Sequence, residues 1–190
     1  MSYFPAFIKL DNLHILIVGG GTIASCKLEH LLDFTNKIKV ISPCLNEKMQ
    51  ILIKENNLEF ENRIYTHNDL KNIDIVIVAI DDIVLQKEIY MQSKINHCLC
   101  NSVDSVDYCD FIFPSYIKKD DLTIAISTGG SSPAFAKQLK KFLNDIIPNN
   151  IGKFLKKMKE YRSVMPKGKQ RMLFLEKEAK KYINKLEKNK

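Results

Sequence analysis

Residues 14 to 24 are His-Ile-Leu-Ile-Val-Gly-Gly-Gly-Thr-Ile-Ala, and this stretch decides the fold. Its apolar run predicts a buried strand, and the glycines predict a tight turn into a helix. Gly19, Gly21 and Ala24 fit the spacing G-x-G-x-x-A in the strand-to-helix context that this motif needs. The pattern therefore predicts that a dinucleotide pyrophosphate binds at the helix N-terminus. The alternative is a tight turn without a ligand.

Strand-like and helix-like blocks alternate after this turn, as in repeated βαβ units. Strands are expected at residues 14–18, 37–42, 58–65, 74–80 and 97–103, and helices at 22–34, 45–55 and 84–95. The run at 74–80 is the most hydrophobic, so we expect it near the centre of the sheet. The fold class that follows is α/β, with a Rossmann-type, mostly parallel sheet.

The pattern changes beyond Pro114. A strand is expected at residues 121–127, and helices at 134–147, 151–163 and 167–188. Pro133 suits the first turn of a helix. The turn before it, Ser-Thr-Gly-Gly-Ser-Ser at 127–132, offers hydroxyl and N–H groups that could hold a carboxylate or phosphate.

Composition indicates an ordinary globular protein, since 45% of the residues are hydrophobic and 27% are charged. No stretch approaches the ~20 apolar residues of a membrane span, and the N-terminus does not resemble a signal peptide. The five cysteines are odd in number and lack the spacing of a disulfide scaffold. We therefore expect a cytoplasmic protein with reduced thiols and no membrane association.

Positive charge is concentrated at the C-terminal end. Residues 151–190 carry 14 Lys or Arg and 4 Glu, a charge of +10, whereas the whole chain carries +7. Such a segment could meet a polyanionic small molecule, an acidic protein or nucleic acid, or simply present solvated lysines. Its only aromatic residues beyond Phe154 are Tyr161, Phe174 and Tyr182, without interleaved basic and stacking positions, so nucleic acid is not expected.

The strand ends carry the candidate polar residues. The acidic residue that usually binds the adenosine ribose is absent after the second strand, where Ser42, Pro43 and Cys44 stand instead. No Arg is present there to bind the 2′-phosphate of NADP, so NAD is favoured. Asp104 ends the fifth strand, where a carboxylate could accept a proton or could instead be a turn residue. Asp81 and Asp82 end the fourth strand, and one of them is expected to cap the next helix.

The histidines and cysteines show no metal-ligand spacing. Cys98 and Cys100 point to one face of a strand, and two ligands this close rarely make a site without partners elsewhere. We expect core cysteines and no permanent metal.

The order of these motifs resembles the precorrin-2 dehydrogenase family, the dehydrogenase/ferrochelatase module of siroheme synthase. The similarity extends from residue 3 to about residue 145. Its pieces are Tyr3-Phe4-Pro5-Ala6-Phe7, Ile17-Val18-Gly19-Gly20-Gly21, Arg63, Asp69-Leu70, Ala79-Ile80-Asp81-Asp82, Asn101-Ser102-Val103-Asp104, Cys109-Asp110-Phe111-Ile112-Phe113-Pro114 and Leu122 to Pro133. Ile80 departs from the Thr of many relatives, Ser102 from a common Val, and the chain from 148 onward is not matched.

The resemblance implies NAD-dependent oxidation of precorrin-2 to sirohydrochlorin, with insertion of Fe²⁺ as a further activity. It implies that Asp104 is the catalytic residue and that the protein is a homodimer. The implied cofactor-binding residues are Gly19, Gly20, Gly21, Thr22, Ile23, Ser42, Pro43, Cys44, Ala79, Ile80 and Asp81. The implied substrate-binding residues are Ser127, Thr128, Gly129, Gly130 and Ser131.

The expected organisation is an NAD-binding Rossmann domain at 1–113, a small dimerisation segment at 114–147 and a basic C-terminal helical region at 148–190. The alternative function is a non-catalytic NAD-sensing regulatory domain. That alternative keeps the glycine turn but needs neither Asp104 nor the loop at 127–133.

Overall fold

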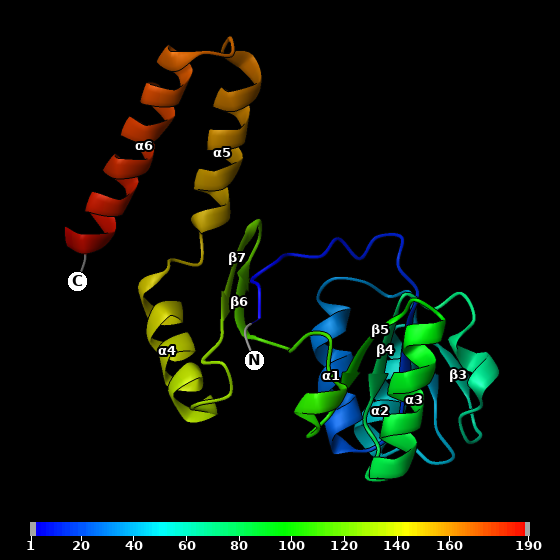
Figure 1. Ribbon diagram of the computed structural model, residues 1–190. Coiled ribbons are helices and arrows are strands. Elements are labelled where there is room, and N and C mark those ends of the chain that lie inside the picture. The colour runs from blue at the N-terminus through cyan, green and yellow to red at the C-terminus, as the bar shows by residue number, and fades with distance from the viewer. Residues whose placement is uncertain (1–2, 189–190) are drawn as a thin grey trace. The chain divides into compact units, whose positions relative to one another are not determined.

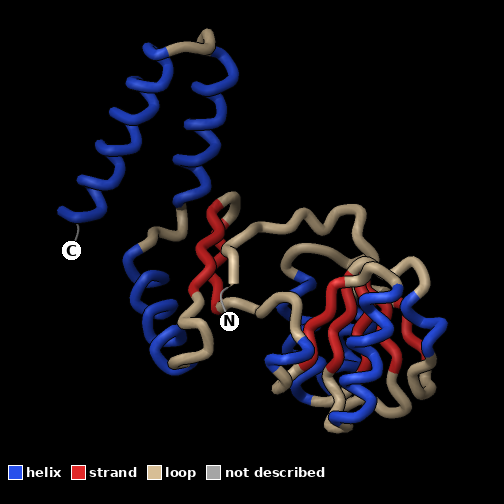
Figure 2. The backbone as a smooth tube through the Cα atoms, viewed as in Figure 1, coloured by secondary structure: helices blue, strands red, loops and turns tan. Residues whose placement is uncertain are grey.

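The computed structural model describes residues 3–188, which fall into two compact units, Tyr3–Ile112 and a second unit that begins at Phe113 (Figure 1). The first unit contains a parallel sheet with helices packed on it. The second contains an antiparallel strand pair and long helices (Figure 2). Among residues 3–188, no helix combines the length and the apolar character that crossing a bilayer requires.

The sheet of the first unit has five parallel strands in the order β3-β2-β1-β4-β5. They are β1 (Ile15–Val18), β2 (Ile38–Ile41), β3 (Glu59–Glu61), β4 (Ile75–Val78) and β5 (Leu99–Ser102). Every residue of β1 and β4 is buried, which confirms the prediction that residues 74–80 lie near the centre. Val18 pairs with both Ile41 and Val78, and Val78 pairs with Ser102. The carboxyl ends of β2, β1, β4 and β5 therefore share one edge.

Helices cover the sheet and complete its core. They are α1 (Thr22–Leu32), α2 (Glu47–Glu55), α3 (Ile83–Ile95) and the short 3₁₀ segments η1 (His67–Leu70) and η2 (Val106–Tyr108). Helix α1 buries Ala24, Leu28 and Leu31, whereas Ile23 on its first turn is 43% exposed. The small Ala24 lets the start of α1 approach the sheet, as the third position of the glycine motif requires.

Residues 58–65 do not form the single long strand that the sequence predicted. Strand β3 covers only three residues, and the chain then turns so that Arg63 forms hydrogen bonds with Asp69, which also accepts one from the Thr66 N–H at 2.6 Å. The ionic and capping contacts of this turn replace further pairing at the edge of the sheet.

The second unit begins with a strand pair that the sequence analysis predicted only in part. Strand β6 (Ser115–Lys119) pairs antiparallel with β7 (Leu122–Ile126), and Asp120 in the connecting turn has φ of +52°. Three helices follow among the described residues: α4 (Pro133–Ile146), α5 (Ile151–Val164) and α6 (Lys169–Lys188). The prediction omitted β6 because its Ser-Tyr-Ile-Lys-Lys sequence is half polar and becomes a strand by pairing with β7.

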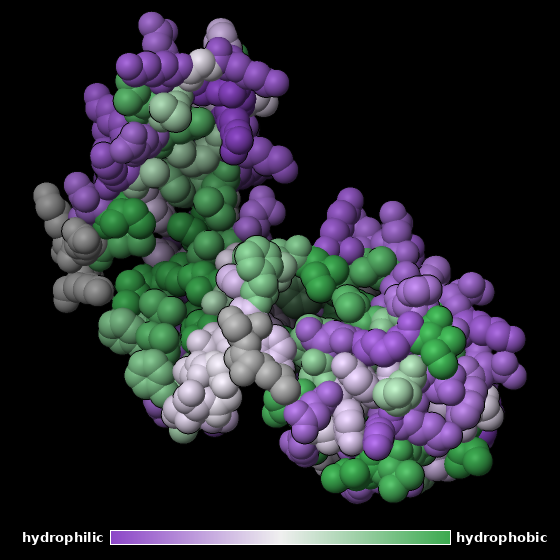
Figure 3. Space-filling view, in the orientation of Figure 1, coloured by the Kyte–Doolittle hydropathy of each residue, from purple (hydrophilic) through white to green (hydrophobic). Residues whose placement is uncertain are grey.

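Aromatic residues join α5 to α6. Phe154 stacks on Tyr182 with ring centroids 4.0 Å apart, and Tyr161 meets Phe174 edge to face at 5.0 Å. These contacts place the aromatic rings of residues 151–190 between the two helices. Hydrophilic side chains gather along the outer edges of α5 and α6 (Figure 3), while Met172 and Leu173 of α6 are 62% and 52% exposed. The surface over α4 is apolar in the same view, and Phe135 and Phe142 are 59% and 58% exposed.

Candidate functional site

The glycine turn after β1 packs against the backbone at the ends of two other strands. Gly19 N–H donates to the carbonyl oxygen of Ile41 at 3.0 Å, and its φ is +123°. A Cβ at Gly19 would overlap the carbonyl oxygen of Ala79, and one at Gly20 would overlap that of Cys44. Close packing therefore requires glycine at both positions.

Gly21 lies in a different environment. Apart from Gly21 itself and its chain neighbours, no described residue places an atom within 4 Å of where a Cβ at this position would lie. Gly21 is also the N-cap of α1, and no described side chain caps that helix. The first-turn N–H groups of a helix attract anions, so the open space beside Gly21 and these groups together fit a pyrophosphate.

The turn after β2 is held by its own polar groups. Ser42 is buried, and its hydroxyl donates to the carbonyl oxygen of Cys44 at 2.6 Å. Asn46 N–H donates to the carbonyl oxygen of Gly20 at 2.9 Å, which joins this turn to the glycine turn. The residues expected beside the adenosine thus lie next to those expected beside the pyrophosphate.

The end of β4 leads directly into α3. Asp82 caps this helix by accepting a hydrogen bond from Leu85 N–H at 3.0 Å, which confirms that one aspartate of the pair is a cap. Asp81 is exposed, and Ile80 is half-buried. The carbonyl oxygen of Ile80 accepts a hydrogen bond of 2.7 Å from the side-chain amide of Gln86.

Asp104 follows β5 in a left-handed conformation, with φ of +61°, and it is exposed. Aspartate is one of the residues that tolerate this region, and such backbone conformations are frequent at functional sites. Val103 N–H donates to Val78 at 2.9 Å, so the turn is fastened to β4. On its other side, the Ser105 hydroxyl donates to the Gln86 amide oxygen at 2.6 Å.

The thiol of Cys109 also forms hydrogen bonds with the turn that carries Asp104. Cys109 Sγ donates to the carbonyl oxygens of Ser102 at 3.1 Å and Ser105 at 3.3 Å, which flank Asp104 in sequence. The backbone around Asp104 is therefore fixed by neighbouring groups while its carboxylate faces solvent.

Lys27 on α1 adds a positive charge to this region. Burial lowers the pKa of Lys27 below its ordinary value of 10.5, while Cys109 and Asp104 act in the opposite direction. Because Coulomb interactions fall with distance, Lys27 is a neighbour of the turn that carries Asp104. Lys27, Gln86 and Ser105 could not be identified from the sequence, because their interactions join residues remote along the chain.

The loop at 127–133, in the second unit, has the turn character expected of it. Pro133 is the first residue of α4, and the Ser132 hydroxyl accepts a hydrogen bond from Phe135 N–H at 3.2 Å. Gly129 and Gly130 have φ of +59° and +85°, and beyond their chain neighbours no described residue lies within 4 Å of where a Cβ at either would stand. Thr128 accepts a hydrogen bond from Ser132 N–H at 3.1 Å, so its hydroxyl orders the loop.

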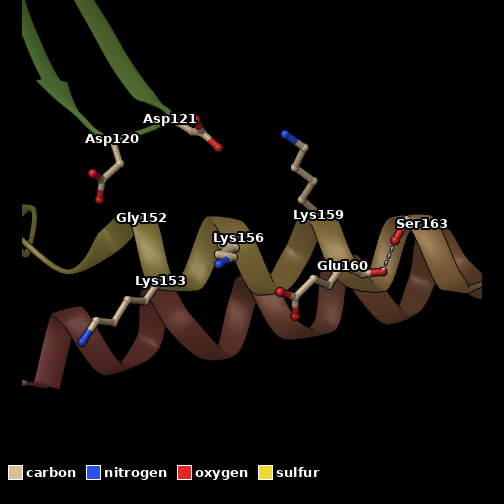
Figure 4. A pocket seen from close by; sticks show the side chains of 8 residues that line it. All are labelled: Asp120, Asp121, Gly152, Lys153, Lys156, Lys159, Glu160 and Ser163. Atoms are coloured by element: carbon tan, nitrogen blue, oxygen red, sulfur yellow. Dashed lines mark hydrogen bonds between the residues drawn. The ribbon is translucent and has the colours of Figure 1, made fainter.

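A hollow of about 700 Å³ lies between the β6–β7 turn and α5 (Figure 4). It is lined by Asp120, Asp121, Gly152, Lys153, Lys156, Lys159, Glu160 and Ser163. The aspartates of the turn face the lysine-bearing helix, and a Cβ at Gly152 would overlap the side chain of Asp120. The hollow is lined by both acidic and basic side chains, so it lacks the single sign of charge that a simple ion site would have.

The cysteines expected in the core are buried. Burial raises the pKa of Cys98 to about 12 and that of Cys100 to about 11, so both are protonated thiols at neutral pH. Within residues 3–188, no group of three or more His, Cys, Asp or Glu side chains is arranged to hold a metal ion.

Two family models match the sequence of this chain. The model of the NAD(P)-binding family matches residues 6–115, which is more than half of the chain. The chain belongs to the NAD(P)-binding family. A second model, the central domain of sirohaem biosynthesis proteins, matches residues 119–145. The two matches confirm the resemblance to the siroheme synthase module.

Curated relatives of this NAD(P)-binding chain include siroheme synthases. That of Pseudoalteromonas atlantica is 35% identical over 163 residues, 84% of this chain and 35% of the relative. That of Actinobacillus pleuropneumoniae serotype 3 is 34% identical over 181 residues, 93% of this chain and 37% of the relative. The chain therefore spans about a third of the length of the curated relatives it matches.

A solved structure has the same fold. The protein described as SirC, precorrin-2 dehydrogenase, superimposes with a TM-score of 0.79 at 22% identity. The match covers 98% of this chain and 100% of that one. It confirms the predicted Rossmann-type fold class.

Proposed function

We propose that this chain is an NAD-dependent precorrin-2 dehydrogenase that forms sirohydrochlorin. One observation carries the proposal: the glycine turn and Asp104 follow β1 and β5, which both pair with β4, so the two features lie on one edge of the sheet. Ligands of open α/β sheets bind at this edge. The names of the similar proteins, siroheme synthase and precorrin-2 dehydrogenase, agree with this reaction.

The cofactor would be held by the backbone more than by side chains. The N–H groups of Thr22 and Ile23, next to Gly21, would bind the pyrophosphate, and Ala79, Ile80 and Asp81 would line the nicotinamide. NAD is preferred over NADP because Ser42, Pro43 and Cys44 supply no cation for a 2′-phosphate. When bound, NAD supplies the acceptor for a hydride.

Asp104 would act as the base of the reaction. Oxidation of precorrin-2 moves a hydride to the cofactor and a proton to a base, and a fixed, exposed carboxylate is suited to the proton. The same carboxylate would remove pyrrole N–H protons if Fe²⁺ enters sirohydrochlorin, so iron insertion is a second proposed activity. Iron is then a substrate.

The second unit would bind the substrate and a second copy of the chain. Ser127, Thr128 and the N–H groups of Gly129 to Ser131 would bind carboxylates of the tetrapyrrole, and the basic segment 151–190 would attract this polyanion. The exposed Phe135 and Phe142 of α4 form an apolar surface suited to a homodimer.

Turnover tests the proposal against the regulatory alternative. Purified protein is incubated with precorrin-2 and NAD without oxygen, and sirohydrochlorin is followed over time; a parallel reaction contains NADP. We expect product with NAD and a lower kcat/KM with NADP. Protein that is folded and binds NAD, yet forms no product, would favour the NAD-sensing alternative. Iron insertion is tested separately by adding Fe²⁺ to sirohydrochlorin, and a rate equal to that without protein would reject it.

A further inference from the structure

A buried amide joins the two halves of the proposed active site. Gln86 lies on the first turn of α3 and is only 4% exposed. Its amide nitrogen donates to the carbonyl oxygen of Ile80 at 2.7 Å, and its amide oxygen accepts from the Ser105 hydroxyl at 2.6 Å. One side chain thus contacts the end of β4 and the turn after β5.

The two hydrogen-bond partners of Gln86 belong to different parts of the proposed active site. Ile80 lies two residues beyond β4, in the segment that would line the nicotinamide, and Ser105 directly follows Asp104. A buried amide destabilises the fold unless its polar atoms are paired, so the contacts with both partners are expected to persist. An apolar side chain could fill the same volume but could not fix the distance between these two segments.

The conformation of Asp104 makes such a contact useful. A left-handed backbone at a residue other than glycine costs about 1–3 kcal/mol and persists where surrounding contacts impose it. The contacts that impose it here come from Val103, Ser105 and Cys109. Of these three, the Ser105 hydroxyl connects the turn through the Gln86 side chain to Ile80, in the segment after β4.

We propose that Gln86 and Ser105 are positioning residues that set the place of the Asp104 carboxylate relative to the nicotinamide end of the cofactor site. The inference rests on the proposed function, since it concerns the same reaction. Displacement of a reacting group by about 1 Å can lower a rate about 100-fold, so a contact of this kind affects kcat. The hydrogen bond between Gln86 and Ser105 does not involve the pyrophosphate turn, so its loss should leave NAD affinity unchanged.

Four variants test this inference. Ser105→Ala removes the hydroxyl, Ser105→Thr keeps it, and Gln86→Met keeps the volume without the amide. Ser93→Ala is the matched control, because Ser93 is also buried and hydrogen-bonded on α3, to Tyr90 at 2.7 Å, but near the other end of the helix. kcat, the KM of each substrate and the Kd of NAD are measured for each variant and for the double variant of Gln86 and Ser105.

We expect Ser105→Ala and Gln86→Met each to lower kcat about 10-fold or more with the Kd of NAD within about twofold. Ser105→Thr should restore most of the rate, Ser93→Ala should match the wild type, and the double variant should be no slower than the slower single variant. These results would not arise from a general loss of stability, which Ser93→Ala would share. If Gln86→Met does not fold, the comparison of Ser105→Ala with Ser105→Thr tests the positioning role by itself.

Wild-type turnover by Ser105→Ala, or independent losses that multiply in the double variant, would overturn the positioning role and leave the proposed function intact. Wild-type protein that binds NAD but does not oxidise precorrin-2 would overturn the proposed function itself, and the positioning role with it.

Discussion

The backbone of Gly19 lies so close to the carbonyl oxygen of Ala79 that no Cβ fits between them. Two residues further on, Gly21 faces open space at the N-terminus of α1. The glycines of one motif therefore have different environments: Gly19 permits two strand ends to pack, and the open space at Gly21 is where we propose that the pyrophosphate binds. This distinction can be tested by measuring stability and binding separately.

Gly19→Ala should destabilise the fold by about 3 kcal/mol or more, because it adds a clash with backbone to a strained φ. Chemical denaturation measures the effect. Gly21→Ala is the control, since an added methyl group there meets no atom within 4 Å beyond its chain neighbours and its φ is −82°, so it should lose about 1 kcal/mol or less. Equal losses in the two variants would contradict the packing role of Gly19.

Gly21→Asp should abolish NAD binding while leaving the free energy of unfolding unchanged or raised by a few tenths of a kcal/mol. Aspartate is a better N-cap than glycine, but its bulk and charge occupy the space proposed for the pyrophosphate. Calorimetric titration with NAD and denaturation of the same preparation measure the two effects. Unchanged NAD affinity would show that the pyrophosphate lies elsewhere.

Asp104→Asn should lower kcat about 100-fold or more, the usual loss when a general base is removed. Asparagine tolerates the left-handed backbone, so stability and NAD affinity should stay near those of the wild type. Asp104→Ala should in addition lose about 1 kcal/mol of stability, since alanine is disfavoured there. Substantial turnover by Asp104→Asn would remove the proposed base.

Asp69 predicts how stability responds to acid. Burial alone would raise the pKa of Asp69, but hydrogen bonds from Arg63 and Thr66 outweigh it and hold the pKa below its ordinary value of 3.8. A lowered carboxylate pKa stabilises the folded state above pH 3.8, and this contribution disappears as the pH falls through the lower folded value.

Asp69→Asn should therefore reduce the free energy of unfolding at neutral pH by about 1–2 kcal/mol and flatten its acid decline. Urea denaturation over a pH series measures both. A variant that keeps the full acid decline of the wild type would show that other carboxylates dominate it.

Much of the first unit could be predicted because its signals are local. The apolar runs of β1 and β4 and the glycines between β1 and α1 specify a parallel sheet and a turn without knowledge of distant residues. Strand β6 could not be predicted, because it forms by pairing with β7. The turn at Arg63 could not be predicted either, because it depends on hydrogen bonds with the carboxylate of Asp69.

In the candidate site, too, residues with a local sequence signal could be predicted and residues identified by long-range contacts could not. Asp104 could be proposed from its place at a strand end and from the family resemblance. Gln86 and Ser105 could not, because their hydrogen bond joins residues whose proximity arises only when β5 pairs with β4. Sequence alone therefore indicated the proposed base and missed the side chains that contact the turn carrying it.

The central claim, that this NAD(P)-binding chain oxidises precorrin-2, is tested most directly by counting products. Precorrin-2 and NAD are mixed with the protein without oxygen, and NADH and sirohydrochlorin are quantified in the same sample, with Asp104→Asn as the control. We expect the two products in equal amounts with the wild type, and both to form about 100-fold more slowly, or slower still, with the variant. Wild-type protein that binds NAD and forms no NADH would contradict the claim.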